Sequence, residues 1–242
     1  MSKFTSVVSF GCVHVPYQDN KALEALYAVL RRERPQYVVC LGDLLDCYDL
    51  SPYDRNPEKG QPIADEIKGA RDFLSRVRSI TPRSSHFYLP GNHEKRLHKY
   101  LVRQAPAVSR FASLRLENVL GLSDIGWAFR GEHSEIVRNW LFCHGDAYVC
   151  SASGNTVRKH LTALGRNCVI AHSHRQGIVR ITTGNNASLT GVEVGCLCRK
   201  DLGERIWEIP IGRMADWQQG FSQIIVNKHS GKLEKAIMHN AE

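Results

Sequence analysis

Short hydrophobic runs rich in strand-forming residues alternate with longer amphipathic segments through the first two thirds of the chain. Each short run ends at glycine or another turn residue before the amphipathic segment begins, which is the order strand, loop and helix. Within these segments apolar residues such as Leu23, Leu26 and Leu30 recur at helical spacing, so the helices would cover a central sheet. The pattern predicts strands at residues 5–10, 37–41, 86–89, 136–143 and 167–171, and helices across residues 23–30, 63–77 and 157–164.

The last third of the chain has a different pattern. After residue 175, "GIVRITT", "SLTGVEVG" and "FSQIIVN" have the character of strands separated by turn residues, with no convincing helix between them. This predicts a second, largely antiparallel sheet. Because a chain of 242 residues with 43% hydrophobic content can bury a sizeable core in one unit, we expect a single domain over residues 1–242.

The composition of the chain limits its expected location and its expected partners. No apolar run approaches the roughly 20 residues needed to span a bilayer, and "MSKFTSVVSFG" lacks the apolar core of a signal peptide. The expectation is a cytoplasmic protein with no membrane partner. A formal net charge of +8 favours an anionic partner such as a phosphate ester or nucleic acid, although a solvated basic surface would give the same charge.

Most of the cysteines do not point to disulfides or a zinc knuckle. Cys40, Cys143 and Cys168 lie in apolar runs, where a reduced thiol acts as a small hydrophobic side chain. The chain has no Cys-x-x-Cys pair. "GCLC" at Cys196 and Cys198 fits either a buried strand end or a site for a soft metal.

Side chains able to bind metal follow one predicted strand after another. The five runs are "GCVH", "LGDLLD", "LPGNHE", "FCHGD" and "IAHSH". Each has an ordinary structural explanation: Asp43 and Asp46 could precede a helix, and Asn92 could belong to a turn. Together, however, five strand ends would place carboxylate, amide and imidazole groups at one edge of a sheet. Such a set can hold two divalent ions.

The motifs GD-x-x-D, GNHE and H-x-H, in this order, resemble those of the calcineurin-like metallophosphoesterases, over roughly residues 7–174. Wider stretches, including "LSPYDRNP", "GNHEKRLHKYLVRQAP", "VRKH" and "VEVGCLC" followed by "DWQQGF", are most similar to small phosphoesterases of phages and prophages. The resemblance implies an α/β fold, built as a two-layer β-sandwich flanked by helices. It also implies phosphoester hydrolysis with two divalent ions, in the cytoplasm of a bacterial host if the gene belongs to a phage.

The resemblance also assigns roles to residues. Asp43 would bridge both ions and bring them to roughly 3.5–4 Å, where a shared water becomes a hydroxide able to attack phosphorus. His93 would act as general acid or charge stabiliser, oriented by Asp46. From the residues alone, Asp146, two positions after His144, could accept the remaining N–H of that imidazole or could be a turn residue after Gly145. The remaining ligands would be His14 and His174 for one ion, and Asn92, His144 and His172 for the other.

Cys12 is the departure from the family pattern, because it stands where these enzymes carry an aspartate ligand. A Cys12 thiolate would supply the same single charge and shift that site from Mg²⁺ toward Zn²⁺ or Fe²⁺, with Mn²⁺ the remaining candidate. Without it, the site keeps only His14, His174 and Asp43 and would be the weaker of the two. The departure leaves two functions open: a metal-dependent phosphoesterase, or a degenerate relative that binds a phosphorylated ligand or partner without efficient catalysis.

The expected substrate is a nucleic acid or a nucleotide, which the protein would hydrolyse as a phosphodiesterase or nuclease, although a cyclic-nucleotide phosphodiesterase or a phosphomonoesterase would share the same site. Cys47 and Tyr48 follow Asp46 where protein serine/threonine phosphatases carry Arg-Gly, so the resemblance points away from these phosphatases. Basic residues spaced at helical intervals after His93 could follow a phosphate backbone or form a solvated face. The basic residues are Arg96, Lys99 and Arg103, and the residues expected to touch substrate are Asn92, Arg55 and Arg96, with Tyr53 and Trp217 as further candidates.

Overall fold

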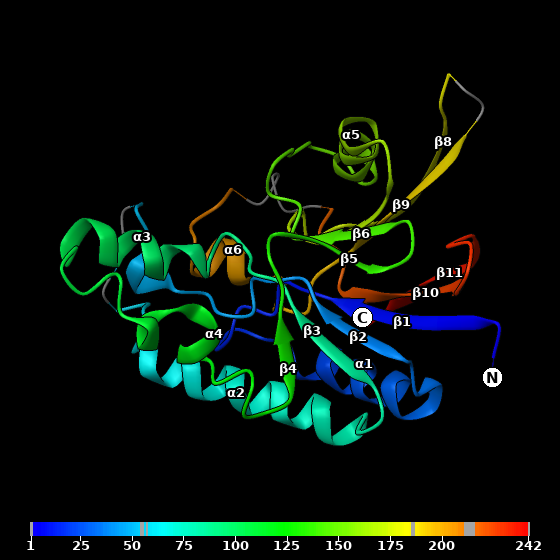
Figure 1. Ribbon diagram of the computed structural model, residues 1–242. Helices are drawn as coiled ribbons and strands as arrows, with labels where there is room; N and C mark the ends of the chain where they lie inside the picture. Colours follow the sequence, from blue (N-terminus) through cyan, green and yellow to red (C-terminus); the bar gives the residue numbers. More distant parts are fainter. Residues whose placement is uncertain (1, 54–55, 57, 185–186, 211–215, 242) are drawn as a thin grey trace.

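The computed structural model describes residues 2–53, 56, 58–184, 187–210 and 216–241. Two mixed β-sheets lie face to face, with helices on their outer faces (Figure 1). This is the α/β fold with a helix-flanked β-sandwich expected from the sequence, and that prediction is confirmed. No helix in the described ranges is both long and apolar enough to cross a bilayer.

The first sheet has the strand order β11-β10-β1-β2-β3-β4. Its four strands from β1 to β4 run parallel, while β10 is antiparallel to β1 and β11 is antiparallel to β10. The strands are β1 Phe4–Phe10, β2 Tyr37–Cys40, β3 Ser85–Tyr88, β4 Trp127–Phe129, β10 Gly220–Asn227 and β11 Leu233–Asn240.

The second sheet has the order β5-β6-β7-β9-β8. Its central strands β6, β7 and β9 are parallel, and the outer strands β5 and β8 are antiparallel to their neighbours. The strands are β5 His133–Val137, β6 Trp140–Cys143, β7 Asn167–Ile170, β8 Gln176–Thr182 and β9 Ser188–Val194.

Two predictions about strands are wrong. The single strand expected at residues 136–143 is a hairpin of β5 and β6, because the chain turns at Asn139, whose φ is +64°. The last third does not form a sheet of its own. Strands β8 and β9 complete the second sheet, while β10 pairs with β1 in the first and is buried along most of its length. A short helix, α6 at Leu202–Arg205, also lies in this part, where none was expected.

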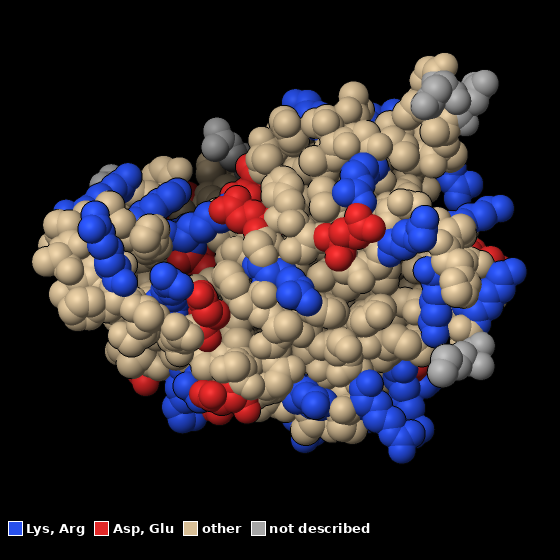
Figure 2. All heavy atoms as spheres, viewed as in Figure 1, with Lys and Arg blue, Asp and Glu red and all other residues tan. Residues whose placement is uncertain are grey.

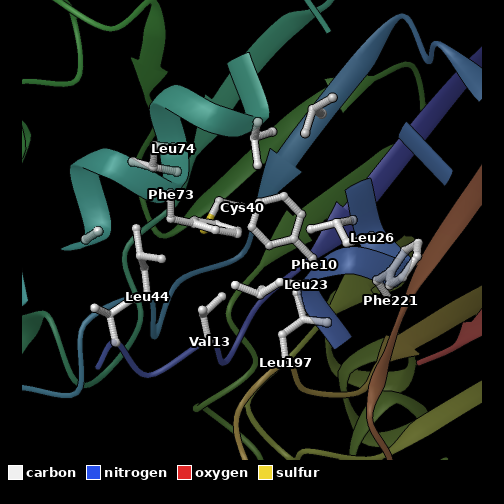
Figure 3. Packing of buried hydrophobic residues seen from close by; sticks show 14 of the residues in the cluster. Phe10, Val13, Leu23, Leu26, Cys40, Leu44, Phe73, Leu74, Leu197 and Phe221 are labelled. Carbon is white, nitrogen blue, oxygen red and sulfur yellow. The ribbon is translucent and has the colours of Figure 1, made fainter. Parts of the chain in front are cut away.

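The outer faces of the sheets are covered by the amphipathic helices that the sequence predicts. Helix α1 begins where the Asp19 carboxylate accepts hydrogen bonds from two backbone N–H groups, and it packs with α2 over the first sheet. Phe10 meets Phe73 of α2 edge-on at 5.6 Å (Figure 3). Helix α5 covers the second sheet through Val157 and Leu161. The helices are α1 Asn20–Glu33, α2 Ile63–Ile80, α3 Lys95–Gln104, α4 Leu116–Val119 and α5 Asn155–Leu164, with 3-10 turns at Tyr48–Leu50 and Ala112–Leu114.

The interior between the sheets is apolar and includes the large side chains of Trp140 and Phe142. The carboxyl ends of the parallel strands β1, β2 and β3 in one sheet, and of β6 and β7 in the other, open at the same end of the sandwich. The five loops carrying the metal-binding motifs follow these strands, so the fold gathers them at one place.

Candidate metal centre

The backbone of the motif loops is held in an unusual conformation. Residues in the left-handed region are uncommon outside glycine and cluster at functional sites. Five of the predicted ligands have φ between +49° and +65°: Cys12, His14, Asp43, His172 and His174. Such a concentration indicates that the surrounding packing fixes the directions of these side chains.

Two glycines allow the loops after β2 and β3 to approach each other. A Cβ on Gly42, whose φ is +88°, would lie 2.2 Å from the backbone nitrogen of Gly91. A Cβ on Gly91 would lie 2.2 Å from Oδ1 of Asp43. Both contacts are far too short for any side chain, so the GD and GN motifs need their glycines for this close approach.

Glu94 joins the same two loops and has a role that the sequence reasoning missed. Its carboxylate accepts hydrogen bonds from the backbone N–H groups of Asp43, Leu44, Leu45 and Gly91, at 2.6–3.0 Å. The side chain is buried at 2% exposure. Its position as the last residue of GNHE was the available signal, and it stabilises the loop that presents Asp43.

On one side of Asp43 lie Cys12, His14 and His174, a group called here the sulfur side. Nε2 of His14 is 3.2 Å from Nε2 of His174 and 3.9 Å from Oδ2 of Asp43. The Cys12 sulfur accepts a hydrogen bond from the backbone N–H of His172 at 3.3 Å, and one ligand atom from each member of the group lies within 4.8 Å of the others. All three side chains are buried.

On the other side lie Asn92, His144 and His172, called here the amide side. Nε2 of His144 is 3.0 Å from Oδ2 of Asp43, 3.0 Å from Oδ1 of Asn92 and 3.1 Å from Nδ1 of His172. His144 donates its Nδ1–H to the backbone carbonyl of Leu41 at 2.7 Å, which leaves Nε2 as the free lone pair. Asn92 and His172 are partly exposed.

The donor atoms fit a metal on each side. Ligand atoms at about 2.1 Å from one ion lie about 3 Å from each other, and the nitrogen–nitrogen separations of 3.2 Å and 3.1 Å match this. The two groups share one carboxylate oxygen, Oδ2 of Asp43. The other oxygen, Oδ1, accepts a hydrogen bond from the backbone N–H of His93 at 2.9 Å. The arrangement therefore suits two cations bridged by Asp43.

The protonation tendencies agree with ligation by several of these imidazoles. Burial and the neighbouring His144 lower the pKa of His172 to about 4, and burial with the neighbouring His14 lowers the pKa of His174 well below its usual value. Both imidazoles are therefore neutral near pH 7, as a ligand must be. Burial and the nearby Asp43 raise the pKa of Cys12, so its thiol ionises only with help from a cation.

His93 lies beside this centre and faces a basic residue. Its Nδ1 donates to the backbone carbonyl of Asp46 at 2.7 Å, and the Arg96 guanidinium approaches its Nε2 at 3.0 Å. The Asp46 carboxylate is 3.4 Å from His93 but 3.1 Å from Nδ1 of His14. Although burial opposes it, the carboxylates of Asp43 and Asp46 raise the pKa of His93. The structure thus ties Asp46 to His14 as well as to the expected His93.

Two tryptophans cover the sulfur side. The ring of Trp207 lies 4.8 Å from His14 and 5.3 Å from His93, and Trp217 lies 4.1 Å from His174, all measured between ring centroids. The indole N–H of Trp207 donates to the Asp46 carboxylate at 3.2 Å. The rings line a cavity of about 800 Å³ that reaches Asp43, His93 and Arg96. Trp207 was missed because nothing near it in the sequence marks it as a site residue.

The remaining candidates from the sequence have different outcomes. Asp146 pairs with Lys95 at 3.1 Å, while the N–H of His144 is taken by Leu41, so Asp146 is not the acceptor considered for it. Cys196 and Cys198 are buried next to His174, with 4.0 Å between the Cys198 sulfur and Nδ1 of His174. Arg55 lies outside the described residues. All eight cysteines are free thiols.

Comparisons with known proteins agree with this geometry. The profile of the family described as calcineurin-like phosphoesterase matches residues 5–190. The Gene 54 protein of Mycobacterium phage D29 is 30% identical over 246 residues, covering 97% of this chain and 93% of its own. The Gene 54 protein of Mycobacterium phage L5 is 29% identical over 248 residues, with the same two coverages.

A structural comparison bears on the fold alone. Vacuolar protein sorting 29 from Cryptosporidium parvum superimposes with a TM-score of 0.50 at 12% identity, over 98% of this chain and 97% of that one. The expected resemblance to small phage phosphoesterases is confirmed by the two phage relatives, which match nearly the whole chain. On the match to residues 5–190 and on these relatives, the chain belongs to the calcineurin-like phosphoesterase family.

Proposed function

We propose that the protein is a metal-dependent phosphoesterase that hydrolyses phosphodiester bonds in nucleic acids or nucleotides. The observation that carries the proposal is the pair of ligand groups meeting at Oδ2 of Asp43, at the floor of a cavity that also holds His93 and Arg96. Two divalent ions bound there would neutralise phosphate charge and lower the pKa of a water nucleophile.

The protein's own side chains would orient the substrate and protonate the leaving group. The Arg96 guanidinium stands at the cavity wall, where Nη1 donates to the Asp46 carbonyl and Nη2 approaches His93 Nε2. A phosphate oxygen could take over the contact with Nη2. His93, once protonated, would donate from Nε2 to the departing oxygen, because its Nδ1 is fixed on the Asp46 carbonyl. Asn92 lies against His144 on the amide side and lines the adjoining hollow, from which it would contact both ion and phosphate.

The donor set indicates which metals to try. Imidazole, amide oxygen and carboxylate suit Mn²⁺, Zn²⁺ and Fe²⁺, and a thiolate at Cys12 would favour the softer Zn²⁺ or Fe²⁺ on the sulfur side. The phage relatives suggest action in the cytoplasm of an infected bacterium, where polynucleotides are abundant phosphodiesters.

The alternative function is that of a binding protein of the same fold, and one observation favours it. Cys12 replaces the carboxylate expected of an active enzyme, and burial keeps its thiol protonated in the absence of metal. A protein of this kind would bind a phosphorylated ligand through Arg96 and the amide side without turnover.

Hydrolysis of bis-p-nitrophenyl phosphate with added Mn²⁺, Zn²⁺ or Fe²⁺ separates the two functions. Turnover by the parent protein that disappears in His93→Ala and Asp43→Asn supports the enzyme. Equal, negligible rates for the parent and both variants with every metal would leave the binding protein as the better account. Lys21→Ala on α1 changes an exposed residue that belongs to neither ligand group, and this variant controls for differences in purification and handling.

A further inference from the structure

A second hollow runs from the metal centre along helix α3. It has a volume of about 410 Å³ and lies between the Leu50–Tyr53 stretch and one face of α3. It shares Ser51, Tyr53 and Arg96 with the cavity over the metal centre, and Asn92 lines its inner end. The two hollows therefore form one continuous path, called here the α3 groove where it follows the helix.

The α3 groove carries unbalanced positive charge. Arg96, Lys99 and Arg103 line it, and none of the described residues lining it is acidic. Lys95 is neutralised by Glu132 and Asp146, whereas Lys99 and Arg103 make no ion pair within the described part of the chain. Figure 2 shows basic side chains gathered over the end of the molecule formed by α3.

Aromatic rings accompany these charges at the surface. Tyr53 is 76% exposed and Tyr100 is 42% exposed, and both line the α3 groove. None of the residues of α3 is buried, although the helix is strongly amphipathic in sequence. A helix that contributes nothing to the core while exposing tyrosines and cations beside a catalytic cavity has the surface chemistry of a ligand site.

We propose that the α3 groove binds a single-stranded polynucleotide, whose scissile phosphate lies at Asp43 while the adjoining nucleotides run along α3. This deepens the proposed function and rests on it. Alternating cations and exposed rings match a strand whose phosphates and unpaired bases are both accessible. In a duplex the bases are stacked on each other and unavailable to Tyr53 and Tyr100, so the groove favours single strands.

The test is equilibrium binding of 5′-fluorescein-labelled dT₁₂ and dT₂ to the full chain by fluorescence anisotropy. Chelator is present, so binding is scored without turnover. The parent should bind dT₁₂ at least tenfold more tightly than dT₂ and more tightly than a 12-bp duplex. In Lys99→Ala/Arg103→Ala, Kd for dT₁₂ should rise at least about tenfold, and the salt dependence should flatten by about 1.4 log units per log unit of salt, because each phosphate contact contributes about 0.7.

The matched control removes two cations elsewhere, in Lys21→Ala/Arg31→Ala on α1, and should bind dT₁₂ like the parent. Tyr100→Ala should raise the Kd for dT₁₂ by about fivefold or more without changing the salt dependence of binding, because stacking on the ring is lost while the charge of the groove is kept. With Mn²⁺ added, the ratio of kcat/KM on dT₁₂ to kcat/KM on bis-p-nitrophenyl phosphate should fall in the groove variants.

Equal weakening in the α1 control and the groove variant would overturn the proposal, as would equal affinity for dT₂ and dT₁₂ or preference for the duplex. The proposed function fails separately, on absent turnover of the nitrophenyl ester by the parent protein. Binding of dT₁₂ through α3 without any turnover would therefore support strand binding in the α3 groove and contradict the proposed phosphoesterase activity.

Discussion

The two sides of Asp43 differ in chemistry and in access. The sulfur side is closed: Cys12 and His14 are fully buried, His174 is 4% exposed, and two indole rings cover it. The amide side has an oxygen ligand in place of sulfur, and Asn92 and His172 reach the surface. The Asp43 carboxylate thus lies between a covered group of side chains that contains sulfur and an accessible group that offers an oxygen donor.

The difference suggests a division of labour within the centre. A covered ion exchanges slowly and is suited to staying with the protein, whereas the accessible side is next to Arg96 and the α3 groove. If Cys12 binds an ion on the sulfur side, metal binding there must also release the thiol proton, because burial raises the pKa of that thiol. We therefore expect the two ions to differ in affinity, exchange rate and preferred element.

The largest effect is expected from Asp43→Asn, which removes the charge shared by both sides. Loss of several kcal/mol of electrostatic stabilisation should lower kcat/KM by at least about 10³-fold and reduce the bound metal on both sides together. Metal content by mass spectrometry and hydrolysis of the nitrophenyl diester measure the two consequences. Asp146→Asn, the same change at a carboxylate paired with Lys95, is the control and should keep both ions. Loss of one ion alone would show that Asp43 does not bridge.

The next effect separates catalysis from ligation. His93 is within 4.8 Å of His14 and Asp43, so it could be counted as a ligand of the sulfur side. Its contacts with Arg96 and the Asp46 carbonyl argue that it is not. His93→Ala should lower kcat about 10²–10⁴-fold while both ions remain bound. If the variant loses an ion together with its activity, His93 is a metal ligand of the sulfur side.

A smaller effect should identify the sulfur ligand. With Co²⁺ as a probe, a Cys12 thiolate gives a charge-transfer band in the near ultraviolet, and Cys12→Ser should abolish it and weaken metal binding about 10–100-fold. Cys198→Ser is the matched control, since this thiol is equally buried but faces the other nitrogen of His174. Cys12→Asp should restore binding and shift it toward Mn²⁺ and Mg²⁺. A band that survives in Cys12→Ser but disappears in Cys198→Ser would show that Cys198, and not Cys12, is the sulfur ligand.

Much of this centre could be predicted from sequence because its residues follow strand ends, where local patterns are strong. His144 directly follows a strand, and His14, Asp43 and Asn92 lie in the loops that immediately follow strands. The partner of β10 could not be predicted, since alternation identifies a strand and says nothing of its neighbour. Trp207 was missed for a related reason. Its position over His14 depends on how a distant segment packs, and no local pattern records that.

The smallest effect should come from changing Trp207, one of the two tryptophans that cover the sulfur side. Trp207→Phe keeps a ring over His14 but removes the hydrogen bond from the indole N–H to the Asp46 carboxylate, which in turn holds Nδ1 of His14. One hydrogen bond to a charged group stabilises this geometry by about 1.5–3 kcal/mol at most, and water can replace part of it. We expect the slowly released ion to leave a few-fold faster when a chelator is added, with the fast phase unchanged. Trp217→Phe, which keeps the ring contact with His174, is the control. Acceleration of the fast phase instead would mean that the covered side is not the one that holds its metal longer, and the contrast between the two sides would be reversed.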